Sequence, residues 1–164
     1  MRLLILCLVA CLSSCMLPSR QETLNTEASQ IQATREKLTR LSNQIKGLCT
    51  NPEYSAYFAK TFCTPNDANI AMMSDKTKIN NSEKIALNAW AQAYDNLASE
   101  MSEVLHAGSP QNKQMALYTD SVAIPAAQKI RRELYDGKIT WGQFNLGRKQ
   151  IFDGILAETR RVHP

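Results

Sequence analysis

The sequence feature that most constrains the fold is an apolar repeat with the period of an α-helix. Between residues 19 and 48, branched apolar side chains recur every seven positions, at Leu24, Ile31, Leu38 and Ile45. Side chains at this spacing share one face of a helix. Stretches of clean alternation between apolar and polar residues, which are typical of half-buried strands, do not occur in the sequence. We therefore expect an all-α fold.

The apolar stripe of this first helix strengthens toward its C-terminal end. Leu41 and Leu48 fill the second apolar position of the repeat, whereas Glu27 and Thr34 leave that position polar earlier in the helix. Two arrangements fit this pattern. Either the first half stands off the domain as a stalk, or the helix packs along its whole length. A helix of about thirty residues would be roughly 45 Å long.

Residues that begin and end helices divide the rest of the chain. Gly137 marks the end of one helix, and Pro125 should kink or split the helix that contains it. Hydroxyl or amide caps, each followed by proline, an acid or glutamine, mark four helix starts. These starts are Thr64-Pro65, Asn80 with Glu83, Ser109-Pro110 and Thr140 with Gln143. The pattern predicts a small antiparallel bundle of four long helices and one short helix, which spans residues 64–74.

The N-terminal residues have the pattern of an export signal. Arg2 is followed by an apolar run over residues 3–12, and then by Ser13, Ser14 and Cys15. The run is shorter than the about 20 residues that a membrane-spanning helix needs. The ending Leu12-Ser13-Ser14-Cys15 resembles the lipobox of bacterial lipoproteins, in which a branched apolar residue and two small residues precede a cysteine.

In that family the thiol receives a diacylglyceryl group, the signal is removed, and the new amino terminus is acylated. The resemblance implies a signal peptide over residues 1–14, a lipid on Cys15, a tether over residues 15–23 and a single helical domain over residues 24–164. Met16, rather than aspartate, follows the cysteine, which by the same resemblance implies the outer membrane, with the protein facing the periplasm.

Two alternatives to this anchor remain. Leu8-Val9-Ala10-Cys11 also fits the lipobox, but cleavage there would leave an apolar core of only about five residues, which is short for an export signal. The other alternative is an ordinary or uncleaved signal peptide.

The remaining composition fits one exported domain. The chain from Cys15 onward has 150 residues, which is enough for a single core. Without Arg2 it has 18 Lys and Arg, one fewer than the 19 of the whole chain, against 15 Asp and Glu. This modest balance does not require nucleic acid, and we expect none as a partner.

Cys49 and Cys63 are expected to form a disulfide. They are the cysteines that follow the anchor, and they lie fourteen positions apart. In an oxidising compartment such a pair indicates a disulfide, and closing a loop of this size stabilises a fold by about 3 kcal/mol in the chain-entropy model. A metal pair is the alternative, but it lacks nearby ligands, because the histidines are His106 and His163. We expect no metal or cofactor.

The segment between these cysteines is rich in aromatic residues. Four of the eleven aromatic residues of the chain are here. We expect these aromatic side chains to fill the open end of the bundle, held there by the disulfide. Phe58 and Phe62, four positions apart, are expected in the core. The alternative is that part of the segment is exposed and binds a partner, because aromatic side chains dominate interface hot spots. Tyr54 and Tyr57 are then the candidate partner-binding residues.

Catalytic signatures are missing from the sequence. Phosphate-binding glycine loops, HExxH and GxSxG do not occur. Glu100 and Glu103 could share a helix face, but a glycosidase pair also needs a cleft and a raised pKa. His106 sits in the last turn of a helix, where a cation suits the dipole. We expect a protein that is not an enzyme.

The C-terminal part is basic, with eight basic and four acidic side chains over residues 129–164. We expect a solvated face there, and contact with anionic lipid or an acidic protein is the alternative. The basic residues are Lys129, Arg131, Arg132, Lys138, Arg148, Lys149, Arg160 and Arg161.

These features favour a non-enzymatic lipoprotein with a binding, assembly or structural role in the cell envelope, acting through a protein partner. Pilotins, small lipoproteins that escort secretin subunits, are one such class, and the likeness is of type only. A hydrophobic groove between the helices at 80–107 and 109–137, able to hold a partner helix, would support that version. The alternatives are an envelope enzyme or inhibitor acting on peptidoglycan, and a passive surface-exposed lipoprotein.

Overall fold

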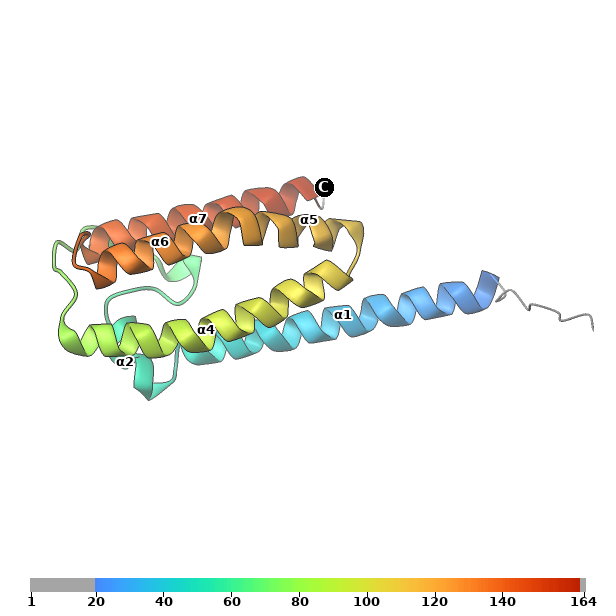
Figure 1. Cartoon of the computed structure of the whole chain (residues 1–164), viewed down its shortest axis with the longest axis horizontal. Helices are drawn as coiled ribbons and strands as arrows, with labels where there is room; N and C mark the ends of the chain where they lie inside the picture. The colour runs from blue at the N-terminus through green and yellow to red at the C-terminus, as the bar shows by residue number, and fades with distance from the viewer. Residues whose placement is uncertain (1–19, 163–164) are drawn as a thin grey trace, which may run out of the picture.

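The computed structural model describes the backbone of residues 20–162 and the side chains of residues 28–162 (Figure 1). The expected signal peptide and Cys15 lie outside the described residues, as does His163. Every regular element in the described part is helical, so the expected all-α bundle is confirmed. The first helix begins at Arg20 and therefore includes residues 20–23, which the sequence division assigned to the tether.

One layer of the bundle consists of α1 (Arg20–Leu48) and α4 (Asn81–Ala107), which pack along each other in opposite directions. The predicted start of α4 is confirmed. The Asn80 side chain accepts a hydrogen bond from the Glu83 backbone N–H at 3.0 Å, and the Glu83 carboxylate accepts one from the Asn80 N–H at 2.9 Å. This reciprocal pair satisfies donors that the first turn of a helix leaves free.

The second layer consists of α6 (Ile124–Tyr135) and α7 (Trp141–Val162), which are antiparallel neighbours (Figure 1). The helix α5 (Pro110–Tyr118) and the π-helical turn η3 (Thr119–Ala123) connect α4 to α6. The turn comes just before Pro125, whose ring would clash with a regular helix and which has no N–H to donate. The predicted interruption of the helix near Pro125 is thus confirmed, as a π-helical turn and not as a break. Gly137 ends α6 with a φ of +68°, which glycine adopts without strain.

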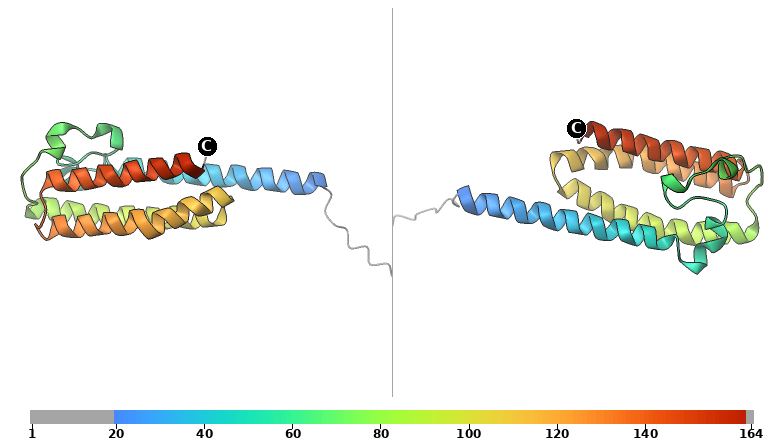
Figure 2. Two further views of the ribbon diagram at one scale, coloured as in Figure 1. Left: turned by 90° about the horizontal axis from the view of Figure 1, so that it is seen from above. Right: turned by 180° about the vertical axis from the view of Figure 1, so that it is seen from behind.

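The beginning of α1 extends beyond the body of the bundle, as Figure 2 shows. Ile31 is 61% exposed, whereas Leu41 is fully buried. The corner between α4 and α5 lies beside residues 30–39 of α1, so the preceding turns project past it. Of the two arrangements that the sequence allowed, the stalk is the one found, because the early half of α1 lacks the second apolar position needed to pack against α4.

Residues 49–63, which we call the disulfide segment, follow α1 at one end of the bundle (Figure 1). The segment begins beside α4, and its last residues, Thr61 and Phe62, reach Arg148 of α7. The segment contains η1 (Pro52–Tyr54) and α2 (Ser55–Phe58), and both contact α4. Beyond it the chain forms η2 (Pro65–Asp67) and α3 (Ile70–Met73).

The prediction of one short helix over residues 64–74 is wrong in detail, because that region forms two separate turns. Ala68 is extended, with a ψ of 128°, and the Asn69 side chain accepts a hydrogen bond from the Met72 N–H at 3.0 Å. Asn69 therefore starts a new helix instead of continuing the first one.

The core is built from aromatic rings on three elements. Tyr57 of α2 stacks on Trp90 of α4, with ring centroids 4.6 Å apart, and also contacts Trp141 and Phe144 of α7. The Trp141 indole N–H donates to the buried Glu83 carboxylate at 3.0 Å. This bond joins the starts of α4 and α7 inside the core.

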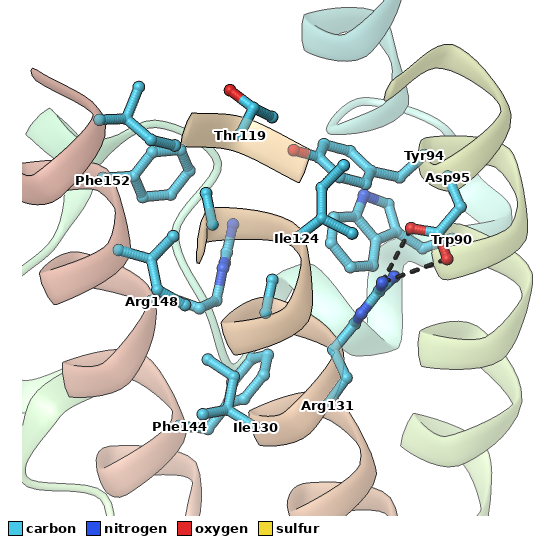
Figure 3. Close-up of a pocket in the computed structure, with 14 residues that line it drawn as sticks. Trp90, Tyr94, Asp95, Thr119, Ile124, Ile130, Arg131, Phe144, Arg148 and Phe152 are labelled. Carbon is cyan, nitrogen blue, oxygen red and sulfur yellow. Dashed lines mark hydrogen bonds and ion pairs between the residues drawn. The ribbon is translucent and has the colours of Figure 1, made fainter. Parts of the chain in front are cut away.

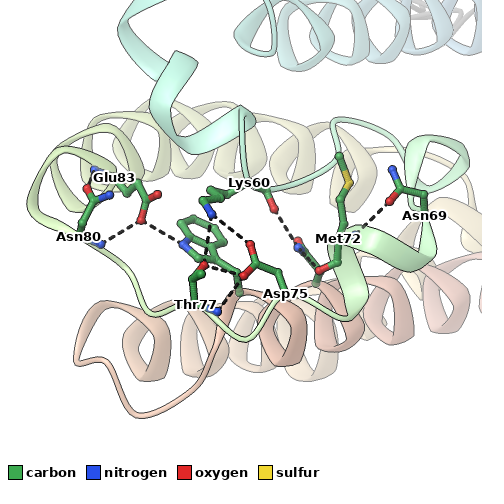
Figure 4. Close-up of polar contacts among 9 residues, drawn as sticks. Lys60, Asn69, Met72, Asp75, Thr77, Asn80 and Glu83 are labelled. Carbon is green, nitrogen blue, oxygen red and sulfur yellow. Dashed lines mark hydrogen bonds and ion pairs between the residues drawn. The ribbon is translucent and has the colours of Figure 1, made fainter.

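The loop over residues 74–80 crosses the start of α7 (Figure 4). The Asp75 carbonyl accepts from the Gly142 N–H at 2.8 Å, and the Thr77 carbonyl accepts from the Trp141 N–H at 3.0 Å. The loop thus supplies acceptors for N–H groups that the first turn of a helix leaves free. The Asp75 carboxylate accepts from the Thr77 hydroxyl and from Lys60, and these bonds lower the pKa of Asp75.

Gly142 allows the loop to come this close. A Cβ at position 142 would lie 2.5 Å from the Met73 carbonyl oxygen and 2.8 Å from the Asp75 carbonyl oxygen. Both are backbone atoms, so neither can swing away.

We predict that Gly142→Ala lowers the free energy of unfolding by about 2–4 kcal/mol, because the added methyl group overlaps fixed backbone. Gly47→Ala is the control, since a Cβ at position 47 meets nothing within 4 Å. It should be neutral or raise stability by up to about 1 kcal/mol. Urea denaturation followed by circular dichroism measures both. Equal effects of the two variants would contradict the close approach at Gly142.

Candidate binding cavity

The disulfide predicted between Cys49 and Cys63 is present, with the two Cα atoms 5.7 Å apart. Cys49 directly follows the last residue of α1, and Cys63 comes two residues before η2. The bond therefore fixes both ends of the disulfide segment at the end of α1. As expected, it ties the end of the first helix to the start of the short helical region.

The alternative that Tyr54 and Tyr57 are exposed and bind a partner is wrong. Tyr54 is 6% exposed and Tyr57 is fully buried. The short helical turns of the disulfide segment direct both rings onto α4, where they join the aromatic core. Burial raises the pKa of the Tyr57 hydroxyl. The expectation that the aromatic side chains fill the open end of the bundle is therefore confirmed for these two residues.

The phenylalanines of this segment behave more nearly as expected. Phe62 is 1% exposed, which confirms its expected place in the core. Phe58 is half-buried and packs edge-on against Tyr57, with ring centroids 5.0 Å apart.

The acidic residues and the histidine that the sequence singled out have surface contacts. Glu100 lies 3.5 Å from both Lys37 and Arg40, so it connects α4 to α1. The His106 ring nitrogen Nε2 lies 2.8 Å from the Asp120 carboxylate, across the corner between α4 and η3. Neither contact lies at the cavity described below.

Most of the C-terminal basic residues match the expected solvated face. Five of the eight have a carboxylate within 4.0 Å, and several of these pairs are between neighbours on one helix. The pairs are Lys129–Glu133, Arg131–Asp95, Lys138–Asp136, Lys149–Asp153 and Arg161–Glu158.

Arg131 and Arg148 depart from this expectation, because the side chain of Arg131 is only 13% exposed and Arg148 is only 9% exposed. Arg148 is the more buried of the two. The sequence held a signal for this burial. Arg148 lies four positions after Phe144 and four before Phe152, so it occupies the inward stripe of α7.

The Arg148 guanidinium is bonded to the disulfide segment. Its Nη1 donates to the Thr61 hydroxyl at 2.5 Å and to the Phe62 carbonyl at 2.7 Å. The guanidinium carbon lies 4.6 Å from the centroid of the Phe62 ring. Four more ring centroids lie within 5.9 Å, those of Tyr57, Trp90, Phe144 and Phe152. Aromatic faces attract a cation at such distances.

A cavity of about 80 Å³ lies beside Arg148, between α4 on one side and η3, α6 and α7 on the other (Figure 3). We call it the central cavity. Its lining is mostly aliphatic and aromatic, and it carries three charged side chains, Asp95, Arg131 and Arg148. The other lining residues are Trp90, Tyr94, Thr119, Ala123, Ile124, Ala127, Ile130, Phe144, Ile151, Phe152 and Ile155.

Arg131 forms the second cationic group of this cavity. Its Nη2 donates to both Asp95 oxygens, at 2.8 and 3.1 Å (Figure 3). Its Nη1 is buried and has no hydrogen-bond partner. A buried donor without an acceptor is unfavourable and is uncommon in folded proteins.

The central cavity differs from the expected groove for a partner helix. Helices α4 and α6 line it, as expected, but α7 closes it. The expected groove was hydrophobic, whereas this cavity is lined by three charged side chains as well. A helix with its side chains is about 10–12 Å wide, so a cavity of about 80 Å³ is too small to hold one. Its size and charge suit a small anionic ligand instead.

Other kinds of site are not indicated in the described part of the chain. Within residues 28–162, no three His, Cys, Asp or Glu side chains come together as a metal site would require. None of the helices described between residues 20 and 162 is both long and apolar enough to cross a bilayer. Comparison of the chain with protein-family models, with curated proteins and with solved structures found no match.

We predict that Tyr57→Ala lowers the free energy of unfolding by about 3–5 kcal/mol, as expected for a large core side chain. Tyr57→Phe should change it by less than about 1 kcal/mol, because the buried hydroxyl contributes little without a bond. That hydroxyl has no hydrogen-bond partner. The neighbouring Thr61 hydroxyl instead accepts from Arg148 and donates to Asn145. Chemical denaturation measures both variants. A small effect of Tyr57→Ala would mean that the ring is exposed after all.

Proposed function

We propose that this protein is a lipid-anchored binding protein of the bacterial cell envelope. In this proposal Cys15 carries the lipid, the outer membrane holds the protein, and the bundle faces the periplasm. The protein is not an enzyme, and its bundle binds a component of the envelope.

The observation that carries this proposal is the projecting start of α1. The helix begins at Arg20, five positions after Cys15. Its residues 20–29 precede the corner between α4 and α5, and ten helical residues span about 15 Å. A helix that leaves the body toward a lipidated residue would hold the bundle away from the membrane surface. A helix buried along its whole length would not do so.

The disulfide supports the same location. Disulfides persist in oxidising compartments, of which the bacterial periplasm is one. The bond closes a segment that fills the core and contributes Thr61 and the Phe62 carbonyl to the buried network. The folded conformation of this segment therefore depends on a compartment in which the disulfide stays oxidised.

The described carboxylates whose pKa is shifted are not suited to donating a proton near neutral pH. A carboxylic acid that donates a proton near neutral pH needs a raised pKa. Hydrogen bonds from Thr77, Lys138 and Arg161 instead lower the pKa values of Asp75, Asp136 and Glu158, respectively. An inhibitor would be expected to present a rigid protruding loop, whereas the disulfide segment is packed against α4 and α7.

Intact-mass spectrometry of the membrane-extracted protein tests the anchor. We expect a mass for residues 15–164 plus a diacylglyceryl group and an acyl chain. Cys15→Ala should yield no lipidated protein, because the lipid is attached to the Cys15 thiol. Cys11→Ala is the matched control, since Cys11 ends the second lipobox-like sequence, and this variant should keep the wild-type mass.

If Cys11→Ala loses the lipid instead, the anchor lies at Cys11 and the assignment to Cys15 is wrong. If neither variant changes the mass, or if the wild-type protein keeps residues 1–14, the lipid-anchor proposal fails.

A further inference from the structure

We propose that the central cavity is a binding site for a small amphiphilic monoanion, a carboxylate attached to a short hydrocarbon chain. The inference rests on the walls of the cavity alone, so it stands whether or not Cys15 carries a lipid.

The charged side chains that line the cavity leave one positive charge unbalanced. Arg131 and Arg148 supply two positive charges, and Asp95 supplies one negative charge. Asp95 is bonded to Arg131 through both of its oxygens, whereas no carboxylate lies within 4.0 Å of Arg148 among the described residues. A buried charge is stable when it is paired, and a monoanion would balance the cavity.

The two guanidinium groups also have free donors. A guanidinium has five N–H bonds. Both hydrogen bonds that Arg148 donates to described residues come from Nη1. Its Nε and Nη2 therefore have no protein acceptor among residues 28–162. The Nη1 of Arg131 is buried without an acceptor. Each guanidinium carbon lies within 5.9 Å of the centroid of the Trp90 ring, so the two groups flank one ring.

Carboxylates and phosphates are the anions that guanidinium groups bind best, because both present oxygens that match the planar fork of arginine. The rest of the lining defines the remainder of the ligand. Ile124, Ile151, Phe152 and Ile155 form apolar walls, which would be matched by hydrocarbon and not by a second polar group.

The size of the cavity limits the enclosed part of the ligand. A cavity of about 150 Å³ has held benzene, and the central cavity is smaller, at about 80 Å³. It can enclose the carboxylate and a few methylene groups. Ala123 of η3 and Ala127 of α6 leave this space open, and longer side chains at these positions would fill it.

Isothermal titration and tryptophan fluorescence of the purified full chain test the site, with hexanoate, hexyl phosphate and hexan-1-ol as probes. Trp90 lines the cavity and should respond to occupancy. Hexanoate should bind, raise the melting temperature and change the fluorescence, whereas hexan-1-ol should bind at least about tenfold more weakly, since it lacks the charged hydrogen-bond acceptor. Comparison with hexyl phosphate distinguishes a carboxylate ligand from the head of a phospholipid.

Three variants distinguish the contribution of the cavity's charges to binding from that of its free volume. Arg131→Gln should weaken hexanoate binding at least about tenfold, and Ala127→Leu should abolish it with all charges retained. Arg132→Gln, the adjacent and exposed arginine, is the matched control and should bind like the wild type. Arg148 is left intact because it also holds the disulfide segment.

Any of three results would overturn the inference. These are no binding of hexanoate to the wild-type chain, equal binding of hexanoate and hexan-1-ol, and an equal loss in Arg131→Gln and Arg132→Gln. The first would mean that the aromatic rings and the Phe62 carbonyl alone stabilise the Arg148 charge.

Discussion

The buried bonds between α7 and the disulfide segment are the interaction on which the rest of the structure depends. Arg148 donates to the Thr61 hydroxyl and the Phe62 carbonyl. Asn145, one turn earlier, accepts from the Thr61 hydroxyl at 2.6 Å and donates to the carbonyls of Lys60 and Met72. These groups are buried, so each bond left unmade would cost about 1–3 kcal/mol. The disulfide segment is therefore held inside the bundle as part of its core.

The position of this segment explains the unusual features of the bundle. The disulfide segment places the Tyr57 ring between α4 and α7, against Trp90 and Phe144. Helix α4 does not pack closely along α6 and α7, and the central cavity lies between them. The aromatic rings that the segment brings in surround the Arg148 guanidinium, which makes a cation acceptable there. The stalk, the disulfide and the cavity thus belong to one arrangement, in which the end of α1 leads directly into the core.

Much of the fold could be predicted from local sequence, and much of the site could not. The starts at Asn80, Ser109 and Thr140 and the interruption near Pro125 follow from local hydrogen bonding and sterics, and the structure has them. The burial of Tyr57 depends on where the disulfide segment lies relative to α4, which no local pattern specifies. The burial of Arg148 could have been predicted from its spacing to Phe144 and Phe152. It was instead assigned to the solvated face because it is charged. The pairing of Arg131 with Asp95 joins residues 36 positions apart and had no signal in the sequence.

A double-mutant cycle between Thr61→Ala and Asn145→Ala tests most directly whether the disulfide segment is bonded into the core. The free energy of unfolding is measured by urea denaturation for the wild type, both single variants and the double variant. We predict a coupling energy of at least about 1 kcal/mol, within the range for residues in one buried network. A coupling energy near zero, with two small and additive single effects, would mean that the segment is not fastened to α7 and would contradict this account of the fold.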